Sequence, residues 1–119
     1  MFRRCALLLG MLVPAPASAA SGIPEIDVIP TETGYEVSGR VLGTSDGVVS
    51  ARLSIMKSDK SGQMNTQQGK TVTTSAGSDN VIGRVNLSAG PDAKLDIVLS
   101  LEVDGRVEAE ATFRLPGAD

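Results

Sequence analysis

Few side chains in this sequence are of a kind that could carry out catalysis or bind a metal ion. The chain of 119 residues contains no histidine and one cysteine, Cys5. A serine nucleophile usually depends on a histidine or lysine base, and structural zinc sites are built from cysteine and histidine. The serines lie mainly in turn-like segments, where their hydroxyl groups bond to the backbone. The composition therefore predicts no catalytic residue and no metal site.

Paired carboxylates are the remaining groups with catalytic potential, at Glu102/Asp104 and Glu108/Glu110. A spacing of two residues along a strand places both carboxylates of a pair on the same face, here the solvent face. Glycoside hydrolysis also requires a cleft lined with aromatic groups, and the chain has one tyrosine, two phenylalanines and no tryptophan. The aspartates do not form a calcium-loop pattern, and no glycine-rich phosphate loop is present. We expect neither enzyme activity nor a cofactor.

The N-terminus has the parts of a secretory signal in the required order. Arginines precede an apolar run at residues 6–13, and small residues follow it. The sequence predicts a signal peptide at residues 1–20, cleaved after Ala19 or Ala20, and export to the periplasm. The apolar run is far shorter than the ~20 residues that span a bilayer, so we expect no membrane anchor.

The remaining residues, 21–119, are expected to form a single domain that contains no cysteine, because Cys5 lies within the signal. This domain can form no disulfide and carry out no thiol chemistry. The net charge of −3 becomes −5 once Arg3 and Arg4 are removed with the signal. An acidic domain without a basic run is a poor match for nucleic acid. We expect a monomer.

Alternation of apolar and polar residues with a period of two recurs along the domain and predicts an all-β fold. Glycine, aspartate and serine clusters separate the alternating segments, and Asp104-Gly105 is the best hairpin signal. This pattern predicts an immunoglobulin-like β-sandwich of about seven antiparallel strands, with a small β-barrel as the alternative. The expected strands cover residues 26–29, 35–42, 48–57, 63–75, 80–87, 95–103 and 106–115.

Two of these strands are expected at sheet edges. Pro24 and Pro30 bracket the first strand, and proline cannot donate to a central ladder. Residues 63–75 are rich in Gln, Asn, Thr and Ser, which predicts one polar edge strand or two short strands interrupted at Gly69.

The alternation also predicts which residues face the core near two irregular positions. Val81 is in phase with Val85, and Gly83 between them weakens the run or marks a bulge. In the last strand Val107 is in phase with Ala109. We therefore expect Val81 and Val107 to face the core.

Two stretches together resemble the CsgH-like curli assembly chaperones, inhibitors of curli amyloid formation of the CsgC/CsgH type. They are ARLSIMKS at residues 51–58 with SGQMNTQQG at residues 61–69, and IGRVNL at residues 82–87. The resemblance extends from about Val37 to Leu115. It implies a periplasmic immunoglobulin-like protein that keeps the curli-type major amyloid subunit soluble. CsgC-type proteins carry a C-x-C pair, which this domain lacks, so any shared role would use surface contacts alone.

Amyloid subunits rich in Gln, Asn, Ser and Gly grow by strand addition. Residues 63–69 could imitate one rung of such a client, while nearby lysines oppose full strand addition. The alternative for this segment is a simple solvated hairpin. The exposed arginines could form a basic stripe facing acidic clients or pair with acidic residues of neighbouring strands. The arginines are Arg52, Arg84, Arg106 and Arg114, and the acidic residues are Glu36, Glu102, Glu108 and Glu110. On the client hypothesis the binding residues are Arg52, Arg84, Gln63, Asn65, Gln67, Lys57 and Lys70.

The sequence thus favours a non-enzymatic protein that binds an unfolded curli-type subunit transiently and inhibits premature fibre assembly. Two other classes stay open. An exported structural or adhesion subunit would polymerise or require a donor strand, and an envelope-ligand binding module would bind a small molecule saturably.

Overall fold

The computed structural model describes residues 20–60 and 62–117, which form an all-β domain. The predicted signal peptide lies, apart from Ala20, outside the described residues. No helix in the described ranges is long and apolar enough to cross a membrane. The strands are β2 (Gly22–Pro30), β3 (Gly34–Gly43), β4 (Gly47–Asp59), β5 (Gly62–Thr74), β6 (Asp79–Ser88), β7 (Lys94–Val103) and β8 (Arg106–Leu115).

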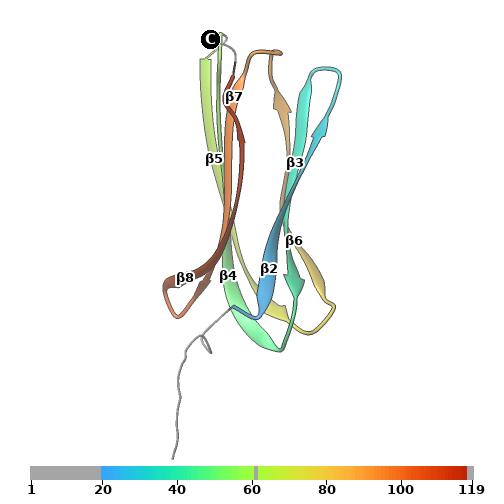
Figure 1. Ribbon diagram of the computed structural model, residues 1–119, viewed down its shortest axis with the longest axis vertical. Helices are drawn as coiled ribbons and strands as arrows, with labels where there is room; N and C mark the ends of the chain where they lie inside the picture. Colours follow the sequence, from blue (N-terminus) through green and yellow to red (C-terminus); the bar gives the residue numbers. More distant parts are fainter. Residues whose placement is uncertain (1–19, 61, 118–119) are drawn as a thin grey trace, which may run out of the picture.

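The strands form two antiparallel sheets that lie face to face (Figure 1). The three-stranded sheet has the order β2-β3-β6, and the four-stranded sheet has the order β5-β4-β7-β8. Both sheets are open, with β2, β6, β5 and β8 at their edges. The predicted β-sandwich is confirmed, and the barrel alternative is wrong. The edge positions predicted for the first strand and for the polar strand are also confirmed, and β5 is continuous through Gly69.

The core is built on the central strands β4 and β7. Leu53 lies opposite Leu99 and Ile55 opposite Ile97, and all four side chains are buried. Gly39 on β3 faces this layer from the other sheet. A Cβ atom at Gly39 would lie 3.2 Å from Leu53 Cδ1, so the glycine lets the leucines reach the facing backbone.

The β3–β6 pairing contains a bulge, in which Ile82 is an additional residue between the paired positions Val81 and Gly83. Because an extra residue reverses the alternation, Ile82 is buried and Val81 is 43% exposed. The bulge suggested by Gly83 is confirmed. The prediction that Val81 faces the core is wrong, since the bulge separates it from the phase of Val85.

The β7–β8 hairpin repeats this behaviour. Asp104 and Gly105 both have positive φ values, 53° and 79°, as a two-residue turn of type I′ requires, so the predicted hairpin is confirmed. Next to the turn, Glu108 is an additional residue in the register. Val107 is therefore 54% exposed instead of facing the core as predicted.

Candidate interaction surface

The side chains of β5 alternate between the interior and solvent. Gln63, Asn65 and Gln67 are exposed on the outer face of the four-stranded sheet, and we call them the amide row. Directly paired residues share a face, and the register places Asn65 beside Met56 of β4. Met56 in turn lies beside Asp96 of β7. The amide row therefore borders a polar surface that crosses three strands.

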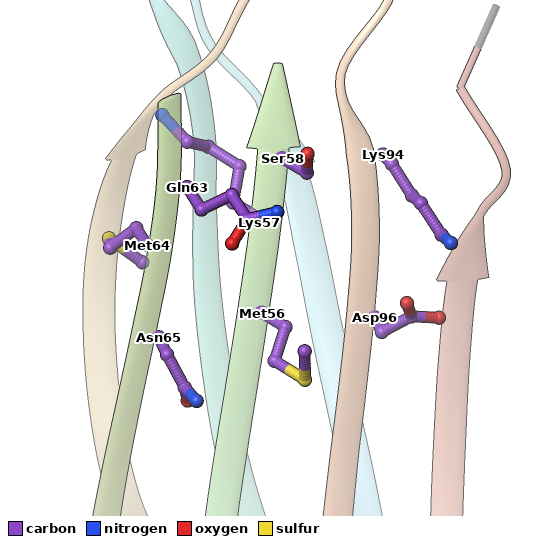
Figure 2. A pocket seen from close by; sticks show the side chains of 8 residues that line it. All are labelled: Met56, Lys57, Ser58, Gln63, Met64, Asn65, Lys94 and Asp96. Carbon is purple, nitrogen blue, oxygen red and sulfur yellow. The ribbon is translucent and has the colours of Figure 1, made fainter. Parts of the chain in front are cut away.

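A hollow of about 210 Å³ lies at one end of this surface. Figure 2 shows Met56, Asn65 and Asp96 on the neighbouring strands β4, β5 and β7. Met56 is 52% exposed, and its flexible thioether can adapt to different neighbours. The hollow is smaller than the roughly 300–1,000 Å³ of small-molecule pockets, so it suits single side chains of a longer ligand. Its lining residues are Met56, Lys57, Ser58, Gln63, Met64, Asn65, Lys94 and Asp96.

Arg52 lies on the same outer face as the amide row. It is paired with Gly69 of β5, which has no side chain to cover the guanidinium. Its Nη1 atom lies 3.9 Å from Glu102 Oε2, and 61% of its side chain is exposed. An exposed pair of this kind contributes about 0–1 kcal/mol, so Arg52 can exchange this partner for another at little cost.

Arg84 lies on the opposite side of the molecule. It belongs to β6, on the outer face of the three-stranded sheet, and its Nε atom lies 3.8 Å from Glu36 Oε2. The two arginines therefore do not form one basic surface. Cross-strand pairing is confirmed for Arg84 with Glu36 and for Arg52 with Glu102. Arg114 pairs instead with Asp96, which the prediction did not include.

Lys57 and Lys70 point toward the other sheet and away from the amide row. Lys57 Nζ donates to the carbonyl of Ser88 at 2.8 Å and lies 3.5 Å from Asp59 Oδ2. Lys70 Nζ donates to the carbonyl of Val81 at 3.4 Å. Both carbonyls belong to β6, so the two lysines tie the sheets together. The structure thus brings Gln63, Asn65, Gln67 and Arg52 to one face and leaves the other three proposed residues elsewhere.

Arg40 and Met56 lie on the outer faces and are not among the binding residues that the sequence predicts. Alternation places both side chains outward, but their neighbours depend on the strand register, which the sequence does not show. Arg40 lies on the outer face of the three-stranded sheet, with Nε 3.2 Å from both Glu25 Oε1 and Asp27 Oδ2, and Nη1 3.2 Å from Asp79 Oδ2. Attraction by Asp27, followed by Glu25, raises the pKa of Arg40 above its usual value. A raised pKa means that the guanidinium stays charged at all lower pH, and its attraction lasts as long as the carboxylates are ionised. Arg40 therefore ties the neighbouring strands together while its acidic partners are charged.

The described residues contain no group of three or more His, Cys, Asp or Glu side chains that could hold a metal ion. The proposed residues are amides and cations with no nucleophile and base placed together. The surface can bind a chain by hydrogen bonds and weak charge contacts.

Two solved structures share this architecture. The chain is similar to the E. coli curli protein CsgC, with a TM-score of 0.67 and 18% identity, covering 78% of this chain and 98% of that one. It is also similar to the solution structure of R. palustris CsgH, with a TM-score of 0.60 and 17% identity, covering 75% of this chain and 89% of that one. No family model and no curated protein matches the sequence. At these identities the likeness concerns the fold, and the CsgC/CsgH-like fold implied by the sequence is confirmed.

Proposed function

We propose that this protein binds curli-type amyloid subunits transiently in the periplasm and inhibits their premature assembly into fibres. The observation that carries the proposal is the shared fold, which covers 98% of the chain of a curli protein. The amide row supports it, because side-chain amides can bond to the Gln- and Asn-rich segments typical of amyloid subunits.

The chemistry of this surface favours brief contacts. Each hydrogen bond to an exposed amide has a net stabilising effect of only about 1 kcal/mol, because it replaces bonds to water. A few such bonds hold an unfolded client for a short time. Short contacts are sufficient to delay nucleation, since nuclei are rare and each needs several client chains to align.

The proposed role needs no chemistry on the client. Cys5 is the only cysteine of the chain and lies within the predicted signal, so the exported domain would act without a thiol. The proposal that the protein is exported rests on the arginines, the apolar run and the small residues at the N-terminus.

Thioflavin-T fluorescence of a purified curli-type major subunit tests this proposal. Residues 21–119 are added below equimolar amounts, and an unrelated acidic β-sandwich serves as the control. We expect the lag before fibre growth to lengthen severalfold with this protein alone. Unchanged kinetics at equimolar protein would refute the proposal. Polymerisation of the protein by itself would favour a structural subunit instead.

A further inference from the structure

The edge strands of the sandwich are not equally open to pairing with another chain. β2 carries Pro24 and Pro30, which limit its hydrogen bonding. β8 has a bulge at Glu108, and β6 has one at Ile82 together with carbonyls bonded to lysines. Prolines, bulges and edge lysines are the usual means by which proteins prevent unwanted strand addition. Three of the four edges are protected in this way.

The edge of β5 lacks these protections over residues 63–69, which we call the open segment. It contains no charged residue and no proline, and it pairs with β4 without a register shift. Among the described residues, no side chain bonds to its backbone. Its residues are exposed or half-buried.

The direction of the free backbone groups follows from a contact further along β5. The carbonyl of Thr73 accepts a hydrogen bond from Asn80 Nδ2 of β6 at 3.4 Å, so it points away from β4. Backbone groups of successive residues point to alternate sides of a strand, and the register of β5 is regular. The N–H and C=O groups of Gln63, Asn65 and Gln67 therefore also point away from β4, toward solvent.

We propose that the open segment takes up one extended, uncharged, Gln- and Asn-rich strand of the client through backbone hydrogen bonds. The inference rests on the proposed function and names its mode of contact. Backbone pairing provides affinity without selecting particular side chains, as in other cases of strand addition to a sheet edge. The amide row would then add side-chain bonds on the outer face.

The charges at the ends of the open segment favour a client over a second copy of this chain. In the antiparallel register that pairs Gln63 with Gln67 of another copy, Lys70 of each copy would come near the turn of the other, which bears Lys60. Like charges brought close together at both ends destabilise strand pairing. A neutral client strand meets no such repulsion, and acidic residues at its ends would be attracted.

Proline substitution separates backbone pairing from side-chain contact. The double variant Asn65→Pro/Gln67→Pro removes two N–H groups that face solvent and leaves the bonds of Met64, Thr66 and Gln68 to β4 intact. The matched control, Asn65→Ala/Gln67→Ala, removes the amides and keeps both N–H groups. Circular dichroism and urea unfolding establish that each variant is folded. If the double variant does not fold, the single variant Gln67→Pro is used in its place.

The readouts are the thioflavin-T lag of the purified major subunit and amide chemical shifts of the ¹⁵N-labelled protein. The second uses a synthetic Gln- and Asn-rich repeat peptide of that subunit as the probe. We expect the same delay to require about tenfold more of the proline variant than of the wild-type protein. The alanine variant should require less than about threefold more. Peptide should shift the amides of residues 63, 65 and 67 in the wild type.

Each other result has a defined meaning. No delay by the wild-type protein refutes the proposed function itself. If the delay survives the proline substitutions and is lost with the alanine substitutions, the proposed pairing at the β5 edge is overturned and binding to the outer face is favoured. Failure of the peptide to shift these amides while the delay persists also overturns the edge. If the wild-type protein forms a dimer and the proline variant does not, a second copy of this chain occupies the edge and the proposed binding of the client there is overturned.

Discussion

The four-stranded sheet ends in two edge strands of very different character. β5 has 13 residues, and its open segment carries no charge and no bulge. β8 has 10 residues, a bulge at Glu108 and charged side chains along its length. Both are attached to the same central pair, β4 and β7. The difference shows that openness of an edge is set by the sequence of that strand and not by the fold.

The contacts between the two sheets also differ beneath the two edge strands, being apolar beneath β8 and polar beneath β5. On the β8 side, apolar groups such as Phe113 and Ala109 pack against the core, together with Ile26 and Val28 of β2. On the β5 side, Lys57, Lys70 and Asn80 connect the sheets by hydrogen bonds to backbone carbonyls. Polar ties hold β6 in place beneath β5 and leave the backbone of the open segment free for a partner.

The largest expected effect is on the stability of the whole sandwich, because both edge strands depend on the same core. Leu53 is fully buried between the sheets, so Leu53→Ala should lower the free energy of unfolding by about 2–5 kcal/mol. Urea unfolding followed by circular dichroism and by Tyr35 fluorescence should show one shifted transition. Ser54→Ala, on the outer face, is the control with little effect. Two separate transitions would contradict a common core and would mean that the edges unfold independently.

The second prediction concerns the polar ties on the β5 side. Only 11% of the Lys57 side chain is exposed, and it donates to Ser88 and lies near Asp59. Lys57→Met should lower the free energy of unfolding by about 2 kcal/mol, as expected for a lost charged hydrogen bond. The exposed Lys70 provides the comparison, since Lys70→Met should cost less than about 0.5 kcal/mol. Equal losses in urea unfolding would show that burial does not distinguish the two ties.

The third prediction gives β5 the protection that β8 already has. Asn65→Lys/Gln67→Lys should raise the amount of protein needed for a given thioflavin-T delay about tenfold, because edge lysines oppose strand pairing. Thr112→Lys on the outer face of β8 is the matched control and should change nothing. A larger loss with Thr112→Lys would place the client on the other edge of the sheet.

Much of the fold follows from the alternation in the sequence, since each strand carries its own pattern of inward and outward residues. The polar composition of residues 63–75 indicates an edge strand without any information on strand pairing. Alternation predicts the wrong face for Val81 and Val107 because each lies beside a bulge. A bulge is defined by the register with the partner strand, which one strand's pattern does not contain.

The candidate site was predictable in part for the same reason. Gln63, Asn65 and Gln67 share a face because they are spaced by two residues on one strand. Arg52 and Arg84 lie on separate sheets, and only the topology places their faces on opposite sides. Lys57 continues the inward phase of Ile55, and its long stem carries the ammonium group to a carbonyl at the margin. Its charge alone favours a place on the client-binding surface.

The smallest expected effect tests whether binding is confined to the side of the sandwich that bears β5. Arg52 lies beside Gly69 of β5, whereas Arg84 lies on the far sheet. Arg52→Gln should reduce the thioflavin-T delay less than about threefold, since a single exposed charge contributes at most about 1 kcal/mol. The reduction should be larger at low ionic strength and shrink near 0.15 M salt, where screening over ~8 Å weakens exposed charges. Arg84→Gln should have no effect at either salt concentration. An equal reduction by both variants would mean that the client contacts both outer faces, and the contrast between the two edges of one sheet would then not determine where it binds.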